Sequence, residues 1–375
     1  MKKYIFIIGI FVFGLALLAQ ELQHETIAIN IEVPVRVFTK GKFVEELTIK
    51  DFEVYEEGIL QKIEALYLVK KSVIEREETE IDTKQAGNIF RPETSRTFIL
   101  MFEMMDYFPE VRDTLDYFFE NVISPGDSLF IVTPLNTYTY DKEYLDETPK
   151  KEIANQINKR LKKDIKIVAM EYKSMINDLQ WLSKVDNPLK DEAADKIFEN
   201  IRDYRYFDDK KLLRFKDQLT EIEGQKYVFL FYQKQIIPLP PEFAADREKR
   251  TFFNAKKIKQ SYADSSININ FIFLTKTKQE SLDMAGTSSS GIVMDDLSAQ
   301  MYGAFQEMAE ATGGISDSSS NIAASFERAA ISSENYYLLY YAPKDYKADG
   351  EFKNIQVKIK GKNYRITHRA GYIAN

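Results

Sequence analysis

The chain has no cysteine and only two histidines among its 375 residues. Without cysteine there can be no disulfide bond, no thiol nucleophile, no thiolate metal site and no lipid attachment of the lipoprotein kind. The histidines, His24 and His368, lie near opposite ends of the chain. A Ser-His-Asp hydrolase or a histidine-rich zinc site is therefore hard to build, and no G-x-S-x-G motif is present. We predict that the protein is not an enzyme.

The chain also lacks a basic charge balance, since its formal net charge is −7 and its pI is about 5.3. A general nucleic-acid-binding protein would be basic, so we predict no nucleic-acid partner. One stretch, Lys150 to Lys166, departs from this balance with seven basic residues against Glu152 and Asp164. A basic helical face can bind anionic lipid or nucleic acid, but in an acidic protein it is more often simply solvated. We expect solvation here, and we expect the single tryptophan, Trp181, to lie in the core.

Only the N-terminus has a long hydrophobic run. Lys2 and Lys3 precede a segment of sixteen residues, Tyr4 to Ala19, which is too short for the roughly 20 residues of a membrane span. Small residues near its end suit a signal-peptidase cut after Ala19. We predict that residues 1–19 are a signal peptide and that the mature protein is secreted or periplasmic. The alternative is an uncleaved anchor, which would be the chain's only contact with a membrane.

Both ends of the remaining chain predict β-structure. Residues 26–69 and 335–373 alternate apolar and polar side chains, the pattern of half-buried strands. Neither segment has enough strands to form a domain alone, so we expect the C-terminal half-module to pair with the N-terminal one in a β-sandwich. Residues 70–95 are dense in charge and predict a linker.

The segment 96–331 predicts an α/β domain. Phe98 to Phe102 is a short apolar run bounded by charge, as in a central strand buried on both faces. Further buried strands are expected at 225–232 and 266–274, and a helical insertion at about 150–220. Strands separated by helices favour a mostly parallel sheet covered on both faces. The predicted fold class is therefore α/β, with this domain inserted into the terminal β-sandwich.

Several short motifs, in this order, resemble the bacterial secreted proteins with a von Willebrand factor type A-like (vWA) domain, called VWFA-related. They are Asp51 to Gly58, Ser124 to Asp127, Ala311 to Gly314, Tyr336 to Tyr341 and Arg369 to Tyr372. The resemblance implies a vWA-like, mostly parallel sheet. It also implies the family's Mg²⁺ site, in which Asp-x-Ser-x-Ser follows the first strand and an Asp follows a later one.

The sequence departs from that metal motif. Glu103 falls on the Asp, whereas Met105 and Tyr107 fall on the two Ser positions and Gln233 on the later acidic position. Because Mg²⁺ needs several compact oxygen ligands, we predict a degenerate site without a metal or other cofactor. Glu103 with Asp106 could still hold Mg²⁺ or another divalent cation in an atypical geometry.

Ligands bind at the carboxyl ends of strands in open α/β sheets. We therefore predict a secreted, non-catalytic, adhesion-type protein-binding module that uses three loops, Glu103–Phe108, Thr133–Thr137 and Gln233–Pro241. Its partner protein is not identified by the sequence. The predicted binding residues are Glu103, Asp106, Tyr107, Phe108 and Gln233. The two aromatic residues suit an interface, although local packing would explain them equally well. The alternative function is a divalent-cation-dependent adhesin that uses Glu103 and Asp106.

Overall fold

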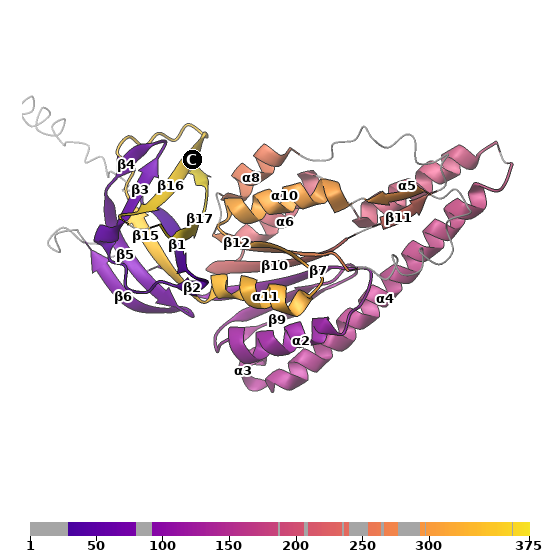
Figure 1. Cartoon of the computed structure of the whole chain (residues 1–375), viewed down its shortest axis with the longest axis horizontal. Coiled ribbons are helices and arrows are strands. Elements are labelled where there is room, and N and C mark those ends of the chain that lie inside the picture. Colours follow the sequence, from indigo (N-terminus) through magenta and orange to yellow (C-terminus); the bar gives the residue numbers. More distant parts are fainter. Residues whose placement is uncertain are drawn as a thin grey trace, which may run out of the picture.

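The computed structural model describes residues 29–79, 92–186, 188–205, 209–234, 236–239, 254–263, 266–276, 293–296, 298–361 and 363–375. The predicted signal peptide and part of the predicted linker lie outside these ranges. The described chain has two parts, a β-module made from both ends of the chain and a larger part in which helices cover a six-stranded sheet (Figure 1).

The β-module contains two antiparallel sheets. The larger sheet curls as a half-barrel in the strand order β17-β1-β15-β5-β6, with β2 also paired to β1. Its strands are β1 (Ile31–Thr39), β2 (Lys42–Phe43), β5 (Ile63–Lys70), β6 (Val73–Thr79), β15 (Asn335–Tyr341) and β17 (Arg365–His368). The smaller sheet has the order β18-β16-β3-β4. Its strands are β3 (Phe52–Glu56), β4 (Ile59–Gln61), β16 (Phe352–Ile359) and β18 (Gly371–Ile373).

Strands from the two ends of the chain pair directly in this module. The C-terminal strand β15 lies between β1 and β5, and β16 pairs with β3. The alternating apolar residues of β1, from Ile31 to Val37, are buried in the core shared by the two sheets. Pairing of these strands allows each sheet to bury one of its faces.

The larger part is organised around β7 (Arg96–Glu103), whose first seven residues are all buried. The sheet order is β14-β12-β10-β7-β8-β9, with parallel pairing from β14 to β8 and an antiparallel edge strand β9. The other strands are β8 (Ser128–Val132), β9 (Thr137–Tyr140), β10 (Gln225–Gln233), β12 (Ile267–Leu274) and β14 (Ser316–Ser319). A separate two-stranded sheet pairs β11 (Ile236–Leu239) with β13 (Val293–Asp296).

Successive residues of β7 face two different cores, because side chains alternate across a strand. Phe98, Leu100 and Phe102 pack with helices α2, α4 and α11, whereas Ile99 and Met101 pack with α6, α8 and α10 (Figure 1). These helices are α2 (Glu110–Tyr117), α4 (Lys150–Leu182), α6 (Asp209–Thr220), α8 (Ala255–Ala263), α10 (Ser298–Ala311) and α11 (Ile322–Ala330). The remaining helical segments are α3 (Lys142–Glu147), α5 (Lys190–Arg205), η1 (Ile49–Asp51), η2 (Phe118–Val122) and η3 (Ile331–Ser333).

The predicted fold class is wrong. Three of the four sheets in the described part of the chain are wholly antiparallel, and the terminal strands form a curled half-barrel with a small sheet beside it rather than a simple β-sandwich. The protein is a mixed α and β structure in which a mostly parallel vWA sheet does not define the class. Periodicity reports burial and not strand direction, so it gave too much weight to the central strands and too little to the termini.

Part of the predicted linker is a strand. Residues 73–79 form β6, which pairs antiparallel with β5 at the edge of the half-barrel. Its glutamates suggested a solvated loop, but charged side chains are common on exposed edge strands because they oppose pairing with another chain. Two glycines, Gly313 and Gly314, lie just after the end of α10. A Cβ atom at Gly314 would lie only 1.8 Å from the Ile269 carbonyl oxygen, so only glycine fits there.

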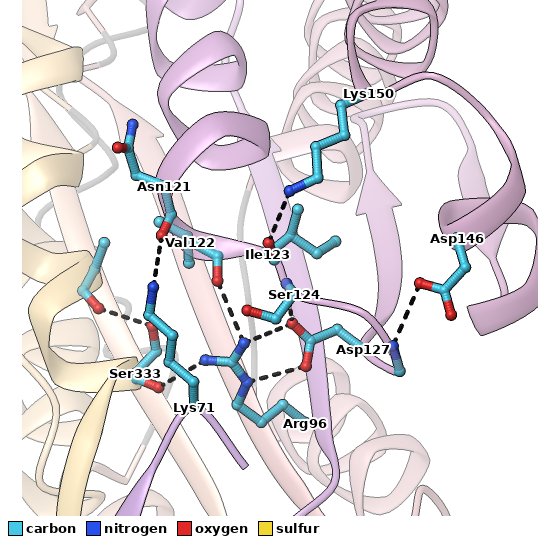
Figure 2. A network of polar contacts seen from close by, with 12 residues as sticks. Lys71, Arg96, Asn121, Val122, Ile123, Ser124, Asp127, Asp146, Lys150 and Ser333 are labelled. Atoms are coloured by element: carbon cyan, nitrogen blue, oxygen red, sulfur yellow. Dashed lines mark hydrogen bonds and ion pairs between the residues drawn. The ribbon is translucent and has the colours of Figure 1, made fainter. Parts of the chain in front are cut away.

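Two buried arginines join the β-module to the larger part. Arg96 Nη2 lies 2.6 Å from Asp127 Oδ2, and its Nε donates to Oδ1 at 3.0 Å. The same guanidinium donates to the carbonyl oxygens of Ser333 and Val122 (Figure 2). Arg36 of β1 donates to the neighbouring carbonyl of Ser332. Both arginines are 1% exposed, and they hold η3 at the point where the chain returns to the β-module.

The contacts around this joint continue through backbone groups. Ser124 N donates to Asp127 Oδ2 at 2.7 Å, and Lys71 of the β-module donates to the Asn121 carbonyl at 3.4 Å (Figure 2). Burial raises the pKa of the Asp127 carboxyl, and the hydrogen bond and charge of Arg96 oppose that rise. Each of the two buried charges is therefore compensated only while the other is present. Removal of one partner leaves a buried charge unpaired.

We expect Asp127→Asn to lower the free energy of unfolding by about 3–5 kcal/mol, the usual effect of breaking a buried ion pair. The matched control is Asp317→Asn, which breaks the Arg328–Asp317 pair, where the arginine side chain is 55% exposed. Exposed pairs contribute about 0–1 kcal/mol. Urea unfolding of the two variants measures the difference, and losses of equal size would contradict the structural role of the joint.

Candidate binding site at the carboxyl edge of the central sheet

The loop after β7 is fixed at both of its ends. It begins after Glu103 with the buried side chain of Met104 and ends with Phe108, which is 5% exposed and belongs to the core under α2. The Phe108 carbonyl accepts a hydrogen bond from Val111 N, so the loop closes directly onto the first turn of α2. Between these ends Met105, Asp106 and Tyr107 are half-buried.

Gln233, at the end of β10, connects this loop to the sheet. Its Oε1 accepts hydrogen bonds from the backbone N–H groups of Met105 and Asp106 at 2.8 and 2.9 Å. Its Nε2 donates to Asp106 Oδ2 and to the Lys276 carbonyl oxygen, both at 3.0 Å. The side chain is only 1% exposed. An amide side chain carries two N–H donors beside an oxygen that can accept two hydrogen bonds, which matches all four contacts made here.

The two predicted aromatic anchors point into the protein. Tyr107 donates a hydrogen bond to Asn158 of α4, and the Lys162 ammonium lies 5.6 Å from its ring centroid. Burial raises the pKa of the Tyr107 phenol. Over the Phe108 ring, at 4.9 Å from its centroid, lies the Lys276 ammonium. Of the two roles considered for these residues, the structure places Phe108 in packing and leaves Tyr107 partly accessible.

Lys276 also organises the rim of this edge. Its Nζ lies 2.9 Å from Glu110 Oε1, at the first residue of α2. That hydrogen bond lowers the pKa of the Glu110 carboxyl. The pair bridges the segment after β12 to the start of α2, so the ends of strands β7, β10 and β12 are joined by side chains.

A buried carboxylate that the sequence did not single out fixes the second loop. Asp164 of α4 is 2% exposed. Its Oδ2 accepts from Thr133 Oγ1, Asn136 Nδ2 and the Tyr138 hydroxyl at 2.8, 3.0 and 2.8 Å. Burial, together with the hydrogen bond to Asp164, raises the pKa of the Tyr138 phenol. The sequence did contain a signal for this buried carboxylate. Asp164 follows Leu161 by three residues and so lies on the apolar face of α4.

The third predicted loop is described only in part. Gln233 and Lys234 are followed by β11, and residues 235, 240 and 241 lie outside the described ranges. Lys234 N donates to the Leu274 carbonyl at 2.7 Å, which keeps the end of β10 beside β12. The structure thus brings Gln233 and Asp106 together, places Glu103 opposite Tyr232 in the strand pairing, and separates Phe108 from the surface.

The residues at this edge do not fit the Mg²⁺ site that the family resemblance implies. Within the described ranges no group of three or more His, Cys, Asp or Glu is placed to hold a metal ion. At the expected position the Gln233 amide directs an N–H group, not an oxygen, toward Asp106. Met105 and Tyr107 provide no compact hydroxyl ligand where the motif has serine. We therefore derive no function that needs a bound cation from these residues.

Comparisons with known proteins do not place the chain in a family. No protein-family model, no curated protein and no solved structure matched it. The resemblance to VWFA-related proteins therefore stays a prediction from the sequence. Its motifs lie partly in the β-module and partly at the ends of elements in the larger part.

We expect Gln233→Glu to destabilise the protein in a pH-dependent way. Above neutral pH the carboxylate oxygen that replaces Nε2 would face the Asp106 carboxylate and the Lys276 carbonyl with no N–H group between them, at a cost of about 2–4 kcal/mol. Burial and the like charge raise the folded-state pKa of the new group above its unfolded value of about 4.3. Stability relative to the parent protein should therefore fall as pH rises from about 4.3 through that raised pKa.

Urea unfolding at about pH 5 and about pH 8 measures this change. The control is Gln233→Met, which has a similar shape but no ionisable group, so its loss should be the same at both pH values. A pH-independent loss in Gln233→Glu would show that the amide does not make the paired contacts described above.

Proposed function

We propose that this protein is a non-catalytic binding module that captures another protein at the carboxyl edge of its central sheet. The observation that carries the proposal is the preorganisation of the loops there. Buried Gln233 fixes the loop after β7, and buried Asp164 fixes the loop after β8, each through several hydrogen bonds. A surface held rigid before a partner arrives loses little conformational entropy on binding.

The composition of this edge also supports binding rather than chemistry. Leu135 is 42% exposed at the tip of the second loop, although its neighbours are firmly hydrogen-bonded. Charged groups lie around the first loop, namely Asp106, Glu110 and Lys276. An apolar contact residue with a polar and charged rim is the usual composition of protein interfaces.

The histidine that the structure describes is used for folding. His368 Nδ1 lies 2.7 Å from the Arg369 carbonyl oxygen, and its Nε2 accepts from Val357 N at 3.3 Å. Burial lowers the pKa of its imidazole. Nε2 therefore serves the contact between β17 and β16, and Nδ1 is occupied by the backbone of the next residue. With the signal peptide that the sequence predicts, we place this binding module outside the cytoplasm.

Photo-cross-linking tests the proposed surface. A photoreactive amino acid at Thr137, exposed in the same loop as Leu135, should give a discrete cross-link to a second protein in cells of the source organism. The same amino acid at Glu120, exposed at the opposite edge of the sheet, should not. Adding Leu135→Asp should reduce the Thr137 cross-link at least about tenfold, as expected for an interface anchor. Equal cross-linking from both edges, or none from Thr137, would overturn the proposal.

A divalent-cation-dependent adhesin is the other function that the sequence suggested, and no contact in the described residues favours it. A cation that binds only the folded state raises the melting temperature, by an amount that corresponds to about 2.7 kcal/mol at 100 times the dissociation constant. We expect the melting temperature to be the same with Mg²⁺, Mn²⁺ or Ca²⁺ as with a chelator. A rise that Asp106→Asn abolishes would restore the cation-dependent function.

A further inference from the structure

The solvent face of α4 carries a line of basic and apolar side chains. Lys159, Lys163, Lys166, Met170, Lys173 and Trp181 follow one another at intervals that keep them on the same side of a helix with 3.6 residues per turn. We call these six residues the outer stripe. All six are exposed, Met170 by 64% and Trp181 by 60%. The stripe is about 33 Å long at 1.5 Å per residue.

The four lysines of the outer stripe form no ion pair among the residues that the structure describes. The neighbouring cations are different, since Arg160 lies over the Tyr138 ring and Lys162 over the Tyr107 ring. The stripe lysines are thus free to meet an external anion.

The prediction that Trp181 belongs to the core is wrong. In the last turns of α4 the buried residues are Leu179 and Leu182, which pack against Ala194 and Ile201 of α5. Trp181 lies on the other side of the helix, where nothing in the described chain covers it. Exposure of a large aromatic side chain is unfavourable in water and commonly marks a contact surface.

The charge of the helical hairpin is divided between its two sides. α5 packs on the face of α4 opposite the stripe, and the hairpin extends beyond the central sheet (Figure 1). The exposed side of α5 is mainly acidic and includes Asp191, Glu192, Asp195 and Glu199. An anionic surface would therefore be attracted to the α4 side and repelled from the α5 side, and this fixes one orientation.

We propose that the outer stripe binds the surface of an anionic lipid bilayer. Lysines near an anionic bilayer are attracted by its negative surface potential. Met170 and Trp181 lie in the same line and can enter the headgroup region, where tryptophan is enriched in membrane proteins. The outer stripe lies along one helix that protrudes from the body of the protein. Such a face fits the flat surface of a bilayer better than a partner with a groove.

The helix would lie on the membrane rather than across it. In the described part of the chain no helix is both long and apolar enough to span a bilayer, and this includes the 33 residues of α4. Instead, two opposite faces of α4 differ. One is buried in the protein, and the other is basic and carries exposed apolar residues. That is the arrangement of a helix that binds at the interface.

Trp181 is the only tryptophan in the chain, so its fluorescence reports on the stripe alone. The full chain is mixed with vesicles of phosphatidylcholine, with or without phosphatidylglycerol. We expect a blue shift with the anionic vesicles only, and quenching by brominated lipid. The shift should disappear at about 1 M salt, where the Debye length falls to about 3 Å. Residues 4–19 are apolar and could hold vesicles by themselves, but they do not affect a signal that is local to Trp181.

The double variant Lys163→Glu/Lys166→Glu should weaken the fluorescence-detected binding at least about 30-fold. The matched control, Lys344→Glu/Lys347→Glu, changes the net charge equally at exposed positions of the β-module and should bind like the parent protein. Equal melting temperatures of the two variants would show that both fold. The proposal is overturned by no shift with anionic vesicles or by equal weakening in both variants. A shift produced only by single-stranded nucleic acid, or only by self-association, would also overturn it.

Discussion

The buried ion pair between Arg96 and Asp127 is the interaction on which the arrangement of the whole molecule depends. Arg96 is the first residue of the central strand β7, and its guanidinium also holds the Ser333 carbonyl, just before the chain returns to the β-module. Desolvation of a guanidinium and a carboxylate is expensive, and only complete pairing offsets it. Arg36 of β1 adds a second bond to the same short helix, so η3 is held by one arginine from each part of the molecule.

At the opposite edge of the central sheet, hydrogen bonds of buried side chains again hold the chain in place. The groups there are neutral or singly charged. Gln233 makes three hydrogen bonds to the loop after β7 and one to the Lys276 carbonyl, and Asp164 accepts from two hydroxyl groups and one amide on one oxygen. A divalent cation performs this task in many proteins, because one ion can order several oxygen ligands. Here side chains from strands and helices order the loops directly. The binding function that we propose rests on the shape that these hydrogen bonds give the edge.

Much of the local structure could be predicted because burial leaves a periodic trace. The run Phe98–Phe102 is within β7, and the apolar residues spaced along 150–182 do form one face of α4. Strand direction and partner choice leave no such trace, and the fold class was wrong for that reason. Trp181 was misplaced because one residue of rotation on a helix moves a side chain to the other face. Gln233 was identified by position, but its hydrogen bonds depend on a loop that follows a different strand.

The pairing of β1 with β15 has a consequence for how the chain is completed. β1 is among the first strands to be made and β15 among the last, yet Ile31 pairs with Tyr341 and Val35 with Tyr337. Contacts between residues so distant in sequence require a large loop to close and form slowly. Until β15 arrives, β1 and β5 have no strand between them, and their edges remain open to other chains. The half-barrel can therefore close only after β15 and β17 have been synthesised, later than every strand of the central sheet.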